Sequence, residues 1–227
     1  MKKTVSLPFM LLAILFCVCL ITSNLLSTKL IQVAGFFTIT GGLFVFPLLF
    51  IINDCIAEVW GYKKTRLVIW MGFAGNFFVL AFAQLAVLSP SPEFWDGEAG
   101  FNFVFRLAPR ITIASFTAFL AGSFLNAYVM SRMKIASNGR HFSIRAMVST
   151  LAGQTLDSFI FFPIAFFGLI HARDLFVMIL VQICIKSLYE FFVLPVTIRV
   201  VKYLKKFEDS DIIDKDISYN VFKISDF

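Results

Sequence analysis

Histidine, cysteine and known catalytic motifs are all scarce in this sequence of 227 residues. Its two histidines, His141 and His171, fall at opposite ends of the apolar segments, so they cannot share a site. No nucleophile elbow, HExxH sequence, phosphate-binding loop or haem motif occurs. The cysteines lack the paired spacing of a zinc site, and in apolar segments they are expected to act as small hydrophobes; they are Cys17, Cys19, Cys55 and Cys184. We therefore expect no enzyme activity, cofactor, metal or disulfide.

Apolar residues are abundant instead. They make up 59% of the chain, and the mean hydropathy is +0.86. Soluble domains are usually about 45–50% apolar, so the excess predicts a membrane protein. The net charge of +6 does not indicate a nucleic-acid partner, because the basic residues stand at the ends of apolar runs and do not form one stripe.

Apolar stretches of about 20 residues or more occur along most of the chain, and each is near or above the length that a membrane-spanning helix needs. There are six of them, at 7–28, 34–58, 66–89, 109–131, 144–170 and 174–202. We therefore predict an all-α integral membrane protein with six transmembrane helices. Residues 1–206 would form a single transporter domain, and residues 207–227 a short cytoplasmic tail. We expect the segment from Ser89 to Ala108 to be an external loop whose aromatic residues dip into the membrane interface.

The distribution of lysine and arginine predicts the orientation. With the N-terminus inside, 13 basic residues before the tail fall on the cytoplasmic side and 4 on the other side. Cytoplasmic loops are enriched in lysine and arginine, so both termini are expected in the cytoplasm. The predicted location is the bacterial inner membrane, in several passes.

Asp157, Lys186 and Glu190 lie inside the last two apolar stretches, where charge is costly. Each ionisable group at the centre of a membrane helix costs about 2.5–3.5 kcal/mol on insertion scales. Gln154 shares a helical face with Asp157, and Gln182, Lys186 and Glu190 follow at steps of four residues. An Asp157–Lys186 or Lys186–Glu190 ion pair could simply join two helices. A functional site is favoured, because stability alone is a weak reason to keep a buried ion pair.

Two further groups of residues are candidates for a functional role, although each could also have a purely structural one. Asp54 and Glu58 are four residues apart on one helical face, and they could gate or couple transport, or merely anchor a loop through the cations that follow. Arg110 could attract a polar ligand, or could snorkel at the interface. The small residues that follow it permit close helix contact; they are Ala114, Ala118, Ala121 and Gly122.

The candidate polar residues together offer hydrogen-bond donors and acceptors at short range. A carboxylate can accept two parallel hydrogen bonds from adjacent donors, such as the ring N–H and exocyclic amine of a guanine-like edge. Phenylalanines near Asp157 and Glu190 could provide flat contacts. This chemistry suits a small planar polar solute.

Several ordered segments, taken together, resemble the queuosine precursor transporters, also called the vitamin uptake transporter family. The matching residues are Asn53-Asp54 through Glu58, Gly61-Tyr62-Lys63 with Arg66, Arg110-Ile111 with Ala114-Ser115-Phe116, Ser149-Thr150, Gly153-Gln154 and Asp157-Ser158, and Lys186 with Tyr189-Glu190 and Pro195. One departure occurs where family members often have Gly-Gln-x-x-Asp, because this chain has Gly122-Ser123-Phe124-Leu125-Asn126.

The resemblance implies an importer of 7-deazaguanine precursors of queuosine, such as preQ0 or preQ1, or queuine and its nucleoside. It implies Asp157, Gln154, Lys186 and Glu190 as substrate-binding residues, with Arg110, Asp54 and Glu58 behind them. The implied partners are this small molecule and the lipid bilayer, and a homodimer is left open. Two alternatives remain. The chain could be the membrane substrate-binding subunit of an ATP-driven vitamin uptake system, or a structural membrane protein with buried ion pairs.

Overall fold

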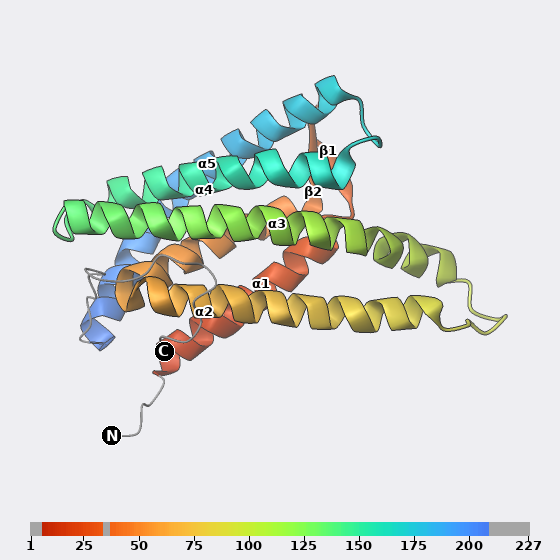
Figure 1. Cartoon of the computed structure of the whole chain (residues 1–227), viewed down its shortest axis with the longest axis horizontal. Coiled ribbons are helices and arrows are strands. Elements are labelled where there is room, and N and C mark those ends of the chain that lie inside the picture. The colour runs from red at the N-terminus through yellow and green to blue at the C-terminus, as the bar shows by residue number, and fades with distance from the viewer. Residues whose placement is uncertain (1–5, 34–36, 209–227) are drawn as a thin grey trace.

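The computed structural model describes residues 6–33 and 37–208, and these form a bundle of long helices with one small hairpin (Figure 1). In chain order the elements are α1 (Leu7–Leu26), β1 (Leu30–Val33), β2 (Phe37–Thr40), the 3-10 helix η1 (Gly41–Phe44), α2 (Phe46–Leu88), α3 (Glu98–Ala136), α4 (Phe142–Phe166) and α5 (Ala172–Glu208). The fold is mostly helical, with five α-helices in the described part of the chain. Four of them, α1, α2, α3 and α5, are long and apolar enough to cross a membrane.

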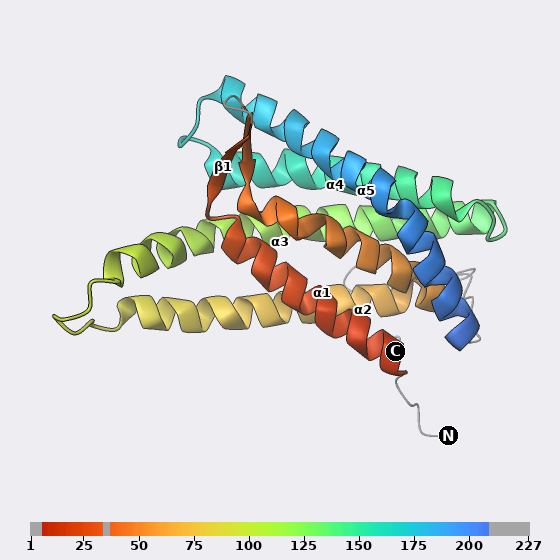
Figure 2. The ribbon, with the colours of Figure 1, turned by 180° about the vertical axis from the view of Figure 1, so that it is seen from behind.

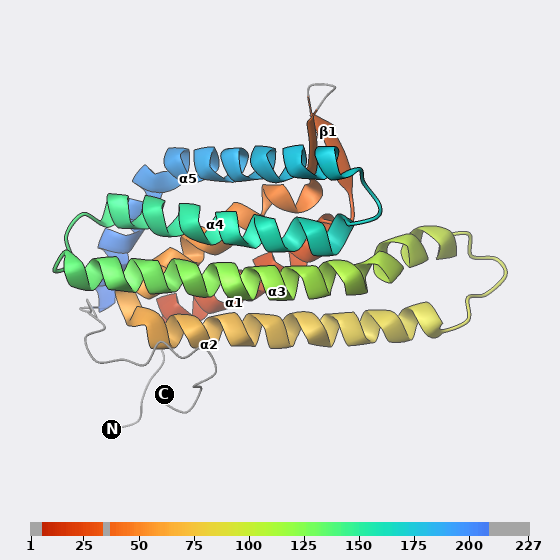
Figure 3. The ribbon, with the colours of Figure 1, turned by 45° about the horizontal axis from the view of Figure 1, so that its top comes forward.

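Gly61 breaks α2 into two halves. Its backbone has φ 82° and ψ 172°, a conformation that an L-residue with a side chain rarely adopts. The first half, up to Trp60, runs in one direction, and the second half runs back beside α3 (Figures 1 and 3). The hydroxyl of Thr65 donates a hydrogen bond of 3.0 Å to the Gly61 carbonyl and steadies the start of the second half. The second and third predicted stretches therefore correspond to the two halves of α2.

Two sequence predictions were wrong in detail. The second stretch was predicted as helix from residue 34, but β1 and β2 form an antiparallel pair, from Leu30 with Thr40 to Val33 with Phe37, and helix begins only at Phe46. The fold is therefore not purely α-helical. The segment Ser89–Ala108 was predicted as a loop, but α3 already begins at Glu98. Residues 34–36 and most of the predicted tail, 209–227, lie outside the described residues.

The bundle has two ends, which we call the Glu58 end and the hairpin end. At the Glu58 end, the start of α1 meets the break in α2, where the rings of Phe9 and Trp60 lie 5.4 Å apart. The end of α5 reaches the same place, since the Trp60 indole donates to Glu208 at 3.4 Å. At the opposite hairpin end, β1 and β2 lie beside the start of α5 (Figure 2). The described chain thus starts and finishes at the same end of the bundle.

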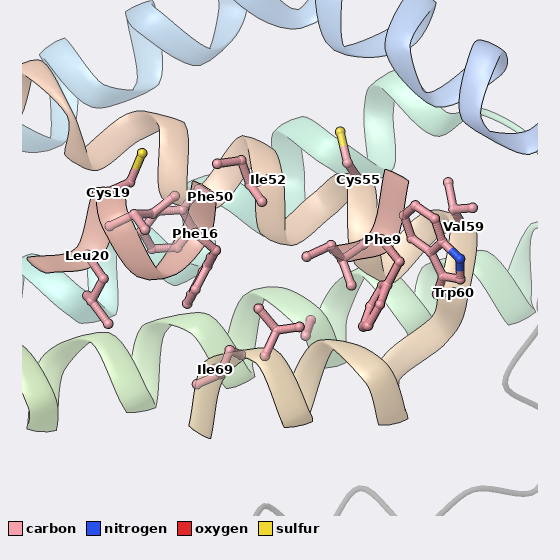
Figure 4. Close-up of a cluster of buried hydrophobic side chains, with 14 of the residues drawn as sticks. Phe9, Phe16, Cys19, Leu20, Phe50, Ile52, Cys55, Val59, Trp60 and Ile69 are labelled. Carbon is pink, nitrogen blue, oxygen red and sulfur yellow. The ribbon is translucent and has the colours of Figure 1, made fainter. Parts of the chain in front are cut away.

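A hydrophobic core rich in aromatic residues joins α1, both halves of α2 and the middle of α3. Figure 4 shows the part of it that α1 and α2 form. Phe119 of α3 contacts rings on three sides, with centroids 5.7 Å from Phe16, 5.7 Å from Phe50 and 5.6 Å from Phe73. Aromatic pairs at such separations contribute about 0.5–1.5 kcal/mol each beyond the burial of their area. The end of α5 joins the same core through Val201 and Leu204, while α4 packs on the other side of α3.

Helices α3 and α4 approach at two glycines. A Cβ atom placed on Gly122 would lie 2.7 Å from the Gly153 carbonyl oxygen and 2.9 Å from the Asp157 Cβ. A Cβ on Gly153 would lie 2.7 Å from the Gly122 carbonyl oxygen. Ala114 and Ala118, from the predicted stripe of small residues, are also fully buried. Small residues allow this backbone contact, which positions Asp157 directly against α3.

We predict that Gly122→Ala destabilises the protein by about 1–3 kcal/mol, because the added methyl group meets backbone atoms of α4 that cannot rotate away. The matched control is Gly75→Ala, also within a helix, where nothing lies within 4 Å of the added Cβ. There alanine should be neutral or stabilising by up to about 1 kcal/mol. Thermal unfolding of the two purified variants and the native chain in detergent measures both stability changes. A melting temperature of Gly122→Ala equal to that of Gly75→Ala would contradict the close contact.

Candidate functional site

Asp157 on α4 and Lys186 on α5 form a buried ion pair. The Lys186 Nζ donates to Asp157 Oδ2 at 3.0 Å, and the two residues are only 5% and 2% exposed. The same Nζ lies 3.9 Å from the centroid of the Phe46 ring at the start of α2. A cation over an aromatic face is stabilised by about 2 kcal/mol when water is excluded. Of the two ion pairs considered from sequence, the structure therefore has Asp157–Lys186.

A pocket adjoins this pair at the hairpin end of the bundle. The pocket is nearly closed in this structure, since its cavity volume is about 20 Å³, which is room for roughly one water molecule. Its walls come from the end of α1, the hairpin and η1, and from α2, α3, α4 and α5. The lining residues are Ser23, Asn24, Ser27, Thr40, Gly42, Leu43, Phe46, Ser115, Asp157, Phe161, Phe162, Gln182 and Lys186.

Polar side chains in this pocket retain unused hydrogen-bonding capacity. The Asn24 Nδ2 and Ser115 Oγ are buried and have no hydrogen-bond partner among the described residues. Gln182 differs, because its Nε2 donates to the Thr40 hydroxyl at 3.2 Å and ties α5 to the hairpin. Buried polar atoms without partners are costly, so these two atoms are suited to bind a polar ligand.

A second polar group surrounds Asp54, deeper in the bundle. Asn126 of α3 donates to Asp54 Oδ1 at 2.6 Å, and the Thr150 hydroxyl of α4 donates to Oδ2 at 3.1 Å. Thr150 lies seven residues before Asp157 on α4, which corresponds to about 10 Å along the helix. Asn126 belongs to the segment where the sequence departs from the usual family motif. The amide at this position therefore binds the carboxylate of α2.

Gln154 and Glu190 are buried near these two groups without hydrogen bonds. Both side-chain atoms of Gln154 and both carboxylate oxygens of Glu190 lack partners in the described part of the chain, and both residues are 0% exposed. Gln154 stands between Thr150 and Asp157 on one face of α4, and Glu190 is one turn beyond Lys186 on α5. Glu190 also interacts electrostatically with Asp54.

Glu58 forms a third group, at the break in α2. Arg145 donates to both carboxylate oxygens at 2.7 and 2.9 Å, and Lys205 donates to Oε1 at 2.6 Å. Lys134 lies 3.8 Å from Oε1 and donates to the Glu58 backbone carbonyl at 2.7 Å. One carboxylate of α2 thus contacts cations from α3, α4 and α5. The sequence prediction considered only the cations that follow Glu58, and these contacts come from other helices.

Arg110 is not part of the pocket lining. Its guanidinium donates to the backbone carbonyls of Ile164 at 2.9 Å and Phe167 at 2.6 Å. These carbonyls are at the C-terminal end of α4, where a cation also complements the helix dipole. Arg110 thus caps α4. Asp157 and Lys186, in contrast, lie together at the pocket.

Sequence reasoning missed the cations that hold Glu58. Lys134, Arg145 and Lys205 were counted only as topology signals at helix ends. Their burial was not visible in the sequence, because lysines and arginines at helix ends usually snorkel to water. Asn126 and Thr150 were noted as parts of motifs, but nothing in their spacing indicated that both would bind Asp54.

No metal site is evident in residues 6–33 and 37–208. Those residues contain no group of three or more His, Cys, Asp or Glu side chains that could hold a metal ion. The four cysteines are free, and two of them, Cys19 and Cys55, are buried.

Comparison with known proteins gives a consistent result. A family model described as "Putative vitamin uptake transporter" matches residues 40–200. A Bacillus subtilis (strain 168) protein named "Probable queuosine precursor transporter" is 29% identical over 154 residues, which are 67% of this chain and 66% of that protein. An Escherichia coli (strain K12) protein named "Queuosine precursor transporter" is 30% identical over 149 residues, 64% of this chain and 62% of that protein.

A third relative, from Haemophilus influenzae, is named "Probable queuosine precursor transporter" and is 29% identical over 137 residues, 56% of this chain and 52% of its own length. The matched regions therefore span two thirds or less of the curated relatives. No solved structure gives a significant match.

We predict that Asp157 and Lys186 are strongly coupled in stability. Asp157→Asn or Lys186→Met alone leaves one buried group without its partner, which costs about 3–5 kcal/mol. The double variant removes both charges and should be less destabilised than the sum of the two single variants. Unfolding of all four proteins in the same detergent measures the coupling, and strictly additive losses would show that the pair does not interact.

Proposed function

Because the chain belongs to the vitamin uptake transporter family, we propose that it imports queuosine precursors into the bacterial cell. The expected substrates are 7-deazaguanines such as preQ0 and preQ1, or queuine and its nucleoside. The names of three relatives support this substrate class. The protein itself is a multi-pass protein of the bacterial inner membrane, as its family and its long apolar helices indicate.

The observation that carries the proposal is the buried carboxylate of Asp157 in the wall of a polar pocket, which would have to widen to admit a base. A carboxylate accepts two parallel hydrogen bonds from a guanine-like edge, and it does so most strongly where water is excluded. In the present state Lys186 balances the charge of Asp157. On binding, the edge of the base would contact Asp157, while Lys186 keeps its contact with the Phe46 ring. Glu190, the other carboxylate considered from sequence, does not line this pocket.

Aromatic and amide groups complete the proposed site. Phe161 and Phe162 line the pocket, and their rings are 5.3 Å apart at a near-perpendicular angle of 88°. One ring can therefore lie flat against a planar base while the other contacts its edge. Gln182 and Ser115 offer donors and acceptors for the remaining polar atoms. Gln154 lies one turn from Asp157 and is proposed to support its position.

We propose six membrane crossings, made by α1, the two halves of α2, α3, α4 and α5. Successive crossings then alternate between the Glu58 end and the hairpin end of the bundle. The excess of 13 basic residues over 4 supports a cytoplasmic Glu58 end and an external hairpin end. The first half of α2, about 22 Å long at 1.5 Å per residue, is shorter than the roughly 30 Å hydrocarbon layer. The hairpin and η1 would cover the remaining depth.

We expect Asp157→Asn to abolish or strongly reduce uptake, because asparagine replaces one acceptor oxygen by a donor and cannot accept both hydrogen bonds of the base edge. The measurement is queuosine content of tRNA in a host that neither makes queuosine nor has its own transporter, fed each precursor in turn. The matched control is Asp174→Asn, the same substitution at an exposed position at the start of α5.

Full uptake by Asp157→Asn would show that the carboxylate does not bind the substrate. Uptake that requires an added ATPase would favour the alternative of a substrate-binding subunit. Absence of uptake and of saturable binding by the purified chain would favour a structural role.

A further inference from the structure

Glu190 differs from the other buried carboxylates of the polar interior. Asp157 has Lys186, Glu58 has three cations and Asp54 has two hydrogen-bond donors. Glu190 is fully buried, and within the described residues its oxygens accept no hydrogen bond. An ionised carboxylate in such a place, without a cation or donor, is strongly unfavourable. A neutral carboxylic acid is the form that this environment can hold.

Asp54 determines which member of the pair carries charge. Its two oxygens each accept a hydrogen bond, from Asn126 and from Thr150, and both bonds favour the ionised form. Two ionised carboxylates that repel one another in a water-free interior do not coexist. The pair therefore holds one negative charge and one proton, and the two hydrogen bonds to Asp54 favour the proton on Glu190.

We propose that Asp54 and Glu190 form a proton-binding site, and that this site couples substrate import to the entry of one proton. The proposal rests on the import function proposed above. Glu190 binds the proton while the pair is open to the external side, retains it while the interior is closed, and releases it to the cytoplasm. The substrate pocket and the proton site remain separate, with Gln154 between them along α4.

In the described part of the chain, the cations around this site are bonded to other carboxylates. From α2 come Asp54, Cys55 and, one turn further, Glu58, which is already bonded to Arg145 and Lys205. From α4 comes Asp157, which holds Lys186. Strand β2, which also contacts α5, carries no titratable side chain. The neighbouring cations are thus occupied, and a proton is the available neutralising charge.

Two amides beside the pair provide independent support. The Asn126 Oδ1 is buried without a donor, although the Nδ2 of the same amide binds Asp54. Gln154 lies on the face of α4 that carries Thr150, and neither of its polar atoms has a partner within residues 6–33 and 37–208. Each carbonyl oxygen needs a donor, and a protonated Glu190 supplies an O–H where an ionised one supplies none.

The test uses the purified full chain in liposomes with labelled preQ1 and membrane potential held at zero. Exchange of labelled for unlabelled preQ1 without a gradient first establishes transport. An interior made one pH unit more alkaline should then drive accumulation to about tenfold for one proton per substrate, since 1.4 kcal/mol is a factor of ten. A sodium gradient at equal pH should drive none.

In Glu190→Gln the steady-state accumulation ratio under the pH gradient should fall to about one, because the amide cannot release a proton. Glu93→Gln, the same change at an exposed loop position, should keep the ratio of the native chain. Asp54→Asn provides a second variant if Glu190→Gln does not fold.

Exchange by the native chain without any response to the pH gradient would overturn the proton coupling and leave the import function intact. Accumulation driven by sodium, or a pH-driven ratio that persists in Glu190→Gln, would overturn it as well. Absence of exchange with preQ1, preQ0 and queuine would overturn the import function and the coupling together.

Discussion

The carboxylate of Glu58 is the interaction on which the arrangement of the bundle depends. It stands at the break in α2 and is bonded to Arg145 of α4 and Lys205 of α5, while Lys134 of α3 binds the adjacent backbone carbonyl. Hydrocarbon cannot satisfy either the charge or the free carbonyls that a broken helix leaves. The three cations satisfy both, so the chain can reverse direction at Gly61 inside the bundle. The reversal in turn places Phe46 and Asp54 opposite α4 and α5.

Along the bundle interior, charge is arranged in an ordered series. The hairpin end has a neutral ion pair, the middle has two carboxylates with only neutral donors, and the Glu58 end has an excess of cations. The members involve different helices: α4 and α5 at the hairpin end, α2, α3 and α4 around Asp54, and α2, α3, α4 and α5 at Glu58. Because α4 contributes a residue to every level, Asp157, Thr150 and Arg145, its polar face acts as the common wall of all three. This explains why α4 is more polar than a lipid-facing helix can be.

Much of the fold and part of the site could be predicted from the sequence, and the limits have physical causes. The long apolar stretches and the stripe of small residues that includes Gly122 follow from hydropathy and periodicity. Asp157 and Lys186 were indicated by the free-energy cost of placing a charge inside an apolar stretch. The hairpin from Leu30 to Thr40 was missed because a short apolar run has the same composition as the start of a helix. The role of Arg110 could not be decided from the sequence. Its hydrogen-bond partners are backbone carbonyls at the end of α4, and every residue has a backbone carbonyl, so the sequence does not indicate which ones are bound.

The contact between Gly122 and Gly153 also limits how the protein can move. Helices that meet through side chains can slide by changing rotamers, but here backbone meets backbone and nothing can rotate. Packed interfaces of this kind shift as whole bodies or not at all. Helices α3 and α4 are thus expected to move as one rigid unit, which includes Asp157. In the proposed transport cycle, opening of the pocket would have to leave the contact between α3 and α4 intact.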